Sequence, residues 1–273
     1  MRSELSDWLM DEPACVECVE LTAEHFFDAQ PEWLPVLTAR YPLCVHGLGL
    51  SLGTPGPLCP TTLDKFCSVV EQVDPLWVSE HIAFTRAGDI DLGHLNPVPH
   101  VQHSLNVLSD HVKELSDRVG KPVLLENITT SLQLPGEYSE TEFLNRLCDQ
   151  SDCGLLLDVT NLYINSKNQG FAIDDWLDQL NLDRIVQLHI VGYSRRAGRY
   201  FDRHRDPIQP ELYELVENIV SRANISAVTI ERDVDIPSPD ILEHELTRLA
   251  ECVRSTSRNE RNSSGHISRM GPT

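Results

Sequence analysis

The feature that most constrains the fold is a regular alternation between short apolar runs and amphipathic segments of helical periodicity. Seven runs rich in Val, Leu and Ile predict strands, at 15–21, 43–49, 76–81, 122–127, 154–160, 185–192 and 227–232. These runs are nearly continuous, without a polar residue at every second position, which is typical of parallel strands that helices cover. Strand–helix repetition of this kind predicts an α/β fold with a parallel sheet.

The segments between the runs carry recognisable helix starts, each followed by apolar residues on one helical face. These starts are Thr62, Pro99, a Ser139–Glu142 capping box, Pro210 and Ser238–Pro239. A chain of 273 residues suits one α/β barrel, and we expect a single domain over 1–253. After Val253 the sequence turns to Ser, Asn, Arg and Gly with few apolar residues, which predicts disorder over 254–273.

The number of strands points to an incomplete barrel. A TIM-type barrel closes with eight parallel strands, and the sequence offers seven. A short helix with Leu5, Trp8 and Leu9 stands where the first strand should already have passed. We therefore predict an α/β fold, a TIM-type (β/α)8 barrel whose first strand is missing from this chain. Either the chain starts late or the barrel has an open seam.

Charge and composition argue against a nucleic-acid-binding, membrane or exported protein. The formal net charge is −20, and residues 1–253 are near −23, which disfavours a nucleic-acid partner. No apolar run is long enough to span a membrane, and the polar N-terminus resembles no signal peptide, so we expect a cytoplasmic protein. The eight cysteines, including the pair Cys15 and Cys18, are expected to be reduced packing residues.

Six consecutive strand candidates end on a side chain that can bind metal. These residues are His46, His81, Glu126, Asp158, His189 and Glu231. In a β/α barrel the carboxyl ends of the strands meet at one mouth, where active sites are built. One such residue alone is usually a helix cap or a loop residue. Six in register favour a metal site, because buried carboxylates repel one another and are costly to desolvate without cations.

Three further residues extend this set. Asn161 follows Asp158 by about one helical turn, and Asp202 and His204 share one side of an extended segment. Nine ligands exceed what one ion can use, so we predict two or three metal ions, with Glu126 as the bridging carboxylate. Imidazoles and carboxylates without thiolates suit zinc, iron or manganese.

Six motifs carry a family resemblance. They are HGLGLSLG (46–53), SEHIAF (79–84), LLEN (124–127), LLLDVTNLYIN (155–165), DRH (202–204) and IERD (230–233). Together they resemble the multinuclear non-haem iron-dependent oxidases, which include the enzymes of methanobactin and 3-thiaglutamate biosynthesis. The resemblance runs from about Glu20 to Pro237. The order of the ligands also resembles the endonuclease IV-like members of the xylose-isomerase-like barrels, which have a histidine where this chain has Asn161.

The oxidase resemblance implies a cofactor, a substrate and a partner. It implies two to three iron ions of mixed Fe(II)/Fe(III) valence, O2 as co-substrate, a ribosomally made precursor peptide modified at cysteine, and a separate protein that presents the peptide. One metal would be held by His46, His81 and Glu126; a second by Glu126, Asp158, His189 and Glu231; and a third by Asn161, Asp202 and His204. The catalytic residues would be His46, His81, Glu126, Asp158, Asp202 and His204.

The same resemblance brings in neighbouring residues and two departures. Asn127 would orient the carboxylate ligands, and Glu20 and Glu24 fall in a segment that resembles the family's Glu-rich second strand. Relatives usually begin with a glycine-rich strand that is missing from this chain. They also commonly show IEWD where this chain has IERD, so that Arg232 changes the charge beside Glu231.

Three other functions remain open on the sequence. A zinc phosphodiesterase of the endonuclease IV kind fits the ligand types, but the acidic chain and Asn161 argue against it. A sugar isomerase or epimerase needs one or two metals, which leaves Asp202 and His204 unexplained. A catalytically inactive scaffold that binds a partner chain is disfavoured by the intact ligand set.

Overall fold

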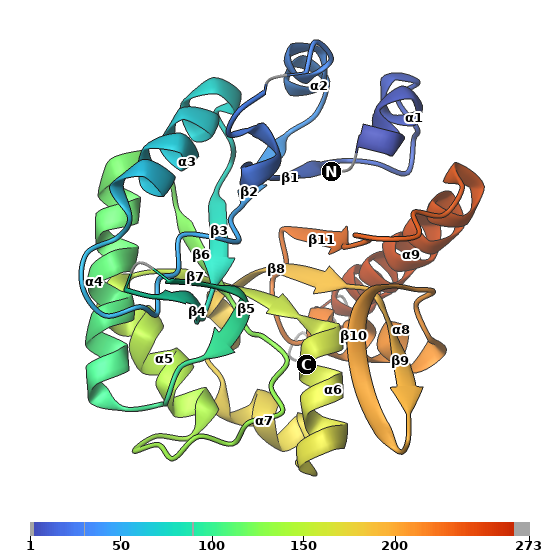
Figure 1. The fold of residues 1–273 in the computed structure, drawn as a ribbon. Helices are drawn as coiled ribbons and strands as arrows, with labels where there is room; N and C mark the ends of the chain where they lie inside the picture. The colour runs from blue at the N-terminus through green and yellow to red at the C-terminus, as the bar shows by residue number, and fades with distance from the viewer. Residues whose placement is uncertain (1–2, 30, 89, 265–273) are drawn as a thin grey trace, which may run out of the picture.

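The computed structural model describes residues 3–29, 31–88 and 90–264, with side chains described between 4 and 254. Its centre is one parallel sheet of seven strands (Figure 1). In sheet order these are β1 (Val19–Thr22), β2 (Leu43–His46), β3 (Val78–His81), β6 (Val123–Glu126), β7 (Gly154–Asp158), β8 (Ile185–Ile190) and β11 (Ala227–Ile230). Each strand candidate in the sequence corresponds to one of these strands, so the predicted α/β sheet is confirmed.

The sheet has two edges within the described part of the chain. β1 pairs only with β2, and β11 pairs only with β8, so the sheet is one strand short of a closed eight-stranded barrel. Between the edges lies a small pocket of about 120 Å3, lined by residues of β1, β11 and two helices, including Leu9 and Leu242. The predicted barrel lacking one strand is confirmed.

Helices cover the outside of the curved sheet (Figure 1). They are α1 (Ser6–Met10), α2 (Leu34–Arg40), α3 (Pro60–Val73), α4 (Gln102–Val119), α5 (Glu140–Ser151), α6 (Val159–Gln169), α7 (Ile173–Gln179), α8 (Pro210–Val220) and α9 (Pro239–Ser264). Short 3-10 helices lie at Ser3–Leu5, Ala23–Phe26 and Leu182–Arg184. None of the described helices is long and apolar enough to cross a membrane.

The predicted helices are observed, two of them with shifted starts: α3 begins at Pro60 instead of Thr62, and α4 begins at Gln102, three residues after Pro99. Pro60 and Pro210 occupy the first turns of α3 and α8, and the apolar face of α3, with Leu63, Phe66 and Val70, is buried. The Ser139 hydroxyl accepts a 3.2 Å hydrogen bond from the backbone N–H of Glu142 at the start of α5.

Two antiparallel hairpins extend beyond the carboxyl ends of the sheet strands. β4 (Ala83–Ala87) and β5 (Ile90–Pro97) follow β3, and β9 (Gly192–Arg196) and β10 (Arg199–Asp206) follow β8. Most of their residues are exposed or half-buried. The sequence did not predict either hairpin, because neither forms an apolar run.

α9 extends past the expected end of the domain at Val253. The helix continues to Ser264, and residues 254–264 contain no proline or glycine. Disorder over 254–273 stays a prediction. The rest of the segment expected to be disordered, 265–273, lies outside the described residues.

Candidate metal centre

The strand register brings the ligand candidates together at the carboxyl end of the sheet. His46, His81, Glu126 and Asp158 are the last residues of β2, β3, β6 and β7. His189 is the penultimate residue of β8, and Glu231 directly follows β11. His81 lies opposite Glu126, and Asp158 lies opposite His189, in neighbouring parallel strands. The five residues on the strands are buried, whereas the Glu231 side chain is 15% exposed.

Glu126 joins two groups of ligand atoms. Its Oε2 lies 3.4 Å from Nε2 of both His46 and His81. Its Oε1 lies 3.5 Å from Nδ1 of His189, which is 3.2 Å from Oε2 of Glu231. Within each group, His46–His81–Glu126 and Glu126–Asp158–His189–Glu231, the candidate ligand atoms lie within 4.8 Å of one another.

A third group lies beside these two and shares Glu231. It consists of His204 of β10, Glu231 and Asp233. Nδ1 of His204 lies 3.4 Å from Glu231 Oε2 and 3.5 Å from Asp233 Oδ2, while Asp202 Oδ2 lies 2.5 Å from its Nε2. The third group therefore differs from the one the resemblance implied, with Asp233 beside His204 and Asp202 at the opposite ring nitrogen.

Asn161 lies at the start of α6, next to Asp158. Its backbone N–H donates to Asp158 Oδ1 at 2.6 Å, and its side-chain amide donates to the Asn127 carbonyl at 3.1 Å. The amide oxygen of Asn161 is buried. Asn161 therefore lies beside Asp158, and its amide oxygen has no hydrogen-bond partner among the described residues.

The backbone of His204 is in an uncommon conformation. Its φ is +50°, in the left-handed region, at a point where the pairing of β10 with β9 shifts between Asp202 and Asp206. A residue other than glycine keeps such a conformation only where its surroundings impose it, which is common at functional sites. The irregularity turns the His204 ring towards Glu231 and Asp233.

Neighbouring polar side chains fix the imidazole rings. Ser79, opposite His46 in the β2–β3 register, places its Oγ 2.9 Å from His46 Nδ1. Glu80 Oε1 lies 3.1 Å from His81 Nδ1, and Glu20 Oε1 lies 2.7 Å from His189 Nε2. These contacts leave His46 Nε2, His81 Nε2 and His189 Nδ1 directed at Glu126, as supporting residues do around bound metals.

Asn127 holds Asp158 through two backbone hydrogen bonds. Its side-chain oxygen accepts from the Asp158 N–H at 2.8 Å, and its NH2 donates to the Asp158 carbonyl at 3.0 Å. This places the carboxylate of Asp158 at the mouth, the orienting role we expected for Asn127.

Burial and mutual charge shift the pKa values of the cluster strongly. Burial opposes ionisation of Glu126, but the positive charges of His81, His189 and His46 hold its pKa below the usual value. Burial would lower the pKa of His189, but the carboxylates of Glu20, Glu126 and Glu231 raise it well above the usual value. Burial, followed by the charges of Glu126 and Asp202, raises the pKa of Asp158. The site thus gathers more negative charge than it can bury without positive charge nearby.

Several buried donor and acceptor atoms in this cluster have no hydrogen-bond partner among the described residues. They are His46 Nε2, Glu126 Oε2, Asp158 Oδ2, Asn161 Oδ1, His204 Nδ1 and Glu231 Oε2. Buried polar atoms are nearly always partnered, so a cluster of unpartnered nitrogen and oxygen atoms needs an explanation. Metal cations would satisfy these atoms, and the nitrogen and oxygen donor set suits iron, zinc or manganese. The residues present therefore fit a metal centre.

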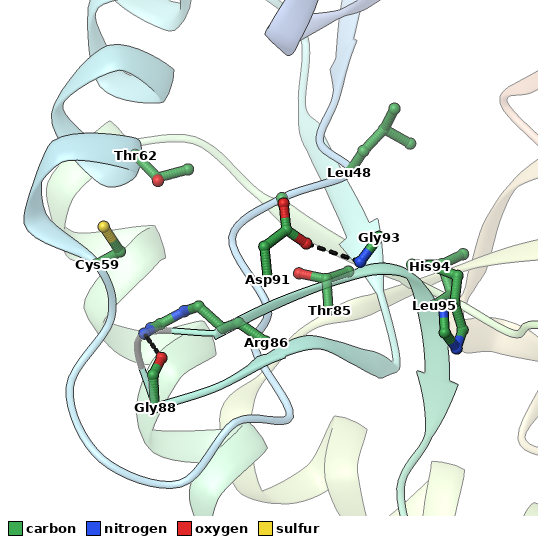
Figure 2. A pocket seen from close by; sticks show the side chains of 11 residues that line it. Leu48, Cys59, Thr62, Thr85, Arg86, Gly88, Asp91, Gly93, His94 and Leu95 are labelled. Carbon is green, nitrogen blue, oxygen red and sulfur yellow. Dashed lines mark hydrogen bonds between the residues drawn. The ribbon is translucent and has the colours of Figure 1, made fainter.

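A pocket of about 640 Å3 lies between the β4–β5 hairpin, the start of α3 and the loop after β2 (Figure 2). Its lining includes Leu48, Thr62, Arg86 and His94, and none of the candidate metal ligands. The N–H groups of Leu48 and Gly49 donate to the Glu24 carboxylate at 2.8 Å. The pocket is therefore distinct from the three ligand groups.

Comparison with solved structures supports the fold. A xylose isomerase domain protein from Alicyclobacillus acidocaldarius superposes with a TM-score of 0.60 at 14% identity, covering 94% of this chain and 95% of the other. Endonuclease IV from Thermus thermophilus superposes with a TM-score of 0.56 at 13% identity. The match covers 95% of this chain and 96% of the endonuclease. At these identities the similarity shows a shared xylose-isomerase-like barrel and nothing of the reaction.

Sequence comparison is more specific. A UPF0276 protein of Acaryochloris marina is 34% identical over 210 residues, 77% of this chain and 76% of its own. One from Chromobacterium violaceum is 34% identical over 233 residues, 84% of each chain. The model of the RiPP precursor modification enzyme family MbnB/TglH/ChrH matches residues 1–254, where a RiPP is a ribosomally made, post-translationally modified peptide. The chain therefore belongs to the MbnB/TglH/ChrH family of enzymes that modify RiPP precursors, as its six motifs indicated.

Proposed function

We propose that this chain holds two to three iron ions at its barrel mouth and uses O2 to oxidise a cysteine of a precursor peptide. The observation that carries the proposal is the overlap of three ligand groups through two shared carboxylates, Glu126 and Glu231. Shared carboxylates are typical of multinuclear centres, and a single ion would leave most of these atoms unpartnered.

The chain's own residues would hold and orient the ions. His46, His81 and Glu126 would hold one; Glu126, Asp158, His189 and Glu231 a second; and His204 with Glu231, Asp233 or Asp202 a third. Bound iron would supply redox chemistry and open positions for O2 and for the substrate sulfur. Ser79, Glu80 and Asn127 would keep the rings and carboxylates in place.

The peptide substrate follows from the family, and we propose that a separate protein presents it. Glu231 and His204, with side chains 15% and 26% exposed, are the candidate ligands that a substrate side chain would reach from outside. A zinc phosphodiesterase would use the same donor types. The chain's charge of −20 disfavours the approach of a nucleic-acid backbone, which supports the peptide reaction instead.

The test uses the full chain, purified without oxygen and loaded with iron. Elemental analysis should return two to three iron ions per chain. With the Cys-containing peptide and the partner encoded by neighbouring reading frames, the protein should consume O2 and change the peptide's mass at cysteine. Asp202→Ala and His204→Ala should abolish that change while circular dichroism shows an unchanged fold.

Two results would overturn the proposal. One is a single bound ion, or zinc alone, after iron-replete anaerobic expression. The other is cleavage of abasic-site DNA by the wild-type protein but not by Glu126→Gln, which would assign the chain to the phosphodiesterases.

A further inference from the structure

The β9–β10 hairpin concentrates positive charge in an acidic protein. Five of the chain's 22 lysines and arginines fall within residues 192–206, although the whole chain carries −20. All five, Arg195, Arg196, Arg199, Arg203 and Arg205, are exposed. A local basic surface on so acidic a molecule attracts anions that the rest of the net charge repels.

The two faces of the hairpin differ. In β10 exposed residues alternate with half-buried ones, so that Arg199, Phe201, Arg203 and Arg205 lie on one face. The opposite face carries Tyr200, Asp202, His204 and Asp206 and is half-buried. We call the residues Arg196, Arg199, Phe201 and Arg203 the outer face of the hairpin. Asp202 and His204 therefore share β10 with three of the four outer-face residues, and Arg196 lies on the paired strand β9.

The outer face contains a like-charged pair. Arg196 lies directly opposite Arg199 in the antiparallel register, next to the turn at Ala197 and Gly198. Like charges directly opposite one another destabilise a sheet. Among the described residues no carboxylate lies within ion-pair distance of Arg196, Arg199 or Arg203, whereas Arg205 pairs with Asp235. A bound anion would offset this repulsion.

The hairpin is held firmly on its other face. Asn168 of α6 donates to the Tyr200 carbonyl at 2.8 Å and accepts from the Tyr200 N–H at 3.0 Å. Tyr163 of α6 stacks on Tyr193 with ring centroids 5.1 Å apart, and Arg195 lies over Tyr200. Figure 1 shows the hairpin beside α6. The outer face is thus presented by an anchored element, which lowers the entropic cost of binding.

We propose that the outer face binds an acidic segment of the precursor peptide and so guides its modified residue to the metal centre. The inference rests on the proposed peptide substrate. Elsewhere the negative surface repels an acidic peptide, which leaves the hairpin as the favoured contact. Phe201, 37% exposed between the arginines, adds an apolar contact for such a segment.

The test measures binding, without turnover. The iron-loaded full chain is titrated anaerobically into a fluorescein-labelled glutamate-rich peptide with one central leucine, and into the same peptide with glutamine at every glutamate. Fluorescence anisotropy should show the acidic peptide binding more tightly, with affinity falling as salt rises. The Arg196→Ala/Arg199→Ala variant should bind the acidic peptide about five- to tenfold more weakly, which lies within the range expected for the loss of two exposed ion pairs.

Matched variants distinguish binding at the outer face from a general effect of the protein's net charge. Lys113→Ala/Arg118→Ala removes the same charge from α4 and should leave the affinity unchanged, and Arg196→Lys/Arg199→Lys should retain most of it. The inference is overturned if the α4 variant weakens binding equally, if both peptides bind alike, or if oligo-dT displaces the acidic peptide at lower concentration. Iron content is measured on each sample, so failure of the metal proposal is seen separately from failure of this one.

Discussion

The two carboxylate oxygens of Glu126 face different ligand groups. Oε2 faces His46 and His81, and Oε1 faces His189. A bridging ligand has this geometry. We therefore expect Glu126→Gln to lose more than one metal ion per chain, because the amide offers one weak acceptor and no charge to either group. Elemental analysis of anaerobically purified protein measures the loss.

A half-buried carboxylate outside the cluster serves as the control. Glu140 accepts a 2.8 Å hydrogen bond from Trp176 Nε1 and has no part in the three ligand groups. Glu140→Gln should bind as much metal as the wild type. Loss of one ion or none from Glu126→Gln would contradict the bridging assignment.

Ser79 would act on a bound metal through His46. Its hydroxyl lies 2.9 Å from His46 Nδ1, so Ser79→Ala removes the contact that sets the ring's orientation. Substitutions of this kind typically cost about 10–100-fold in metal affinity. Competition with a chromogenic chelator gives the affinity. Ser109→Ala removes a buried hydroxyl from α4 that has no hydrogen-bond partner among the described residues, and should leave the affinity unchanged.

Residues directly at strand ends were visible in the sequence, whereas the residues that support them, apart from Asn127, were not. His46, His81 and Glu126 each terminate an apolar run, which made them recognisable. Glu80 shares a strand with His81, and strand alternation would point it away from the mouth, yet its carboxylate returns to His81's own N–H at 2.8 Å. Asp233 lies beyond the end of β11, where no periodicity says which way a side chain turns.

A buried ion pair links α9 to the residue that follows Glu231 at the end of β11. Arg232 Nη2 lies 2.9 Å from both carboxylate oxygens of Glu245, and its Nη1 donates to the Arg205 carbonyl in the β9–β10 hairpin. Both side chains are nearly fully buried. Arg232→Met or Glu245→Gln should destabilise the protein by about 3–5 kcal/mol, because each leaves a buried charge or donor unpaired. Urea unfolding followed by circular dichroism measures this.

The double variant distinguishes the cost of an unpaired buried charge from the cost of disturbed packing. Arg232→Met/Glu245→Met removes both charges and should recover most of the stability lost by either single change, as apolar replacement of buried pairs often does. Additive losses in the double variant would contradict the view that the cost comes from an unpaired buried charge.

Elements with an apolar signal were predictable and elements without one were not. The sheet strands are buried on both faces, so their sequences are continuous apolar runs. β10 carries polar or charged residues at most positions, and β5 interrupts its Ile and Leu residues with Asp, Gly, His, Asn and Pro, so a single sequence does not distinguish either from a loop.

Metal removal should lower the stability of the whole molecule. Cations that bind only the folded chain stabilise it by mass action, by about 2.7 kcal/mol at a hundredfold excess over Kd. For a chain of this size that corresponds to a Tm about 5–10 °C higher. Anaerobic scanning calorimetry before and after chelation measures the shift, and adding Fe(II) back should restore it. A Tm that chelation leaves unchanged would contradict metal binding by the folded state.

The third ligand group is built on different architecture from the first two. His46, His81, Glu126, Asp158 and His189 sit on sheet strands, whereas His204 comes from the β9–β10 hairpin inserted after β8. Shortening that hairpin would remove its contacts with α6 and with Arg232 but would leave the pairing of the seven sheet strands unchanged. If the centre holds metal as we propose, a barrel of this design could gain or lose one ion through a single insertion, with the same strand register.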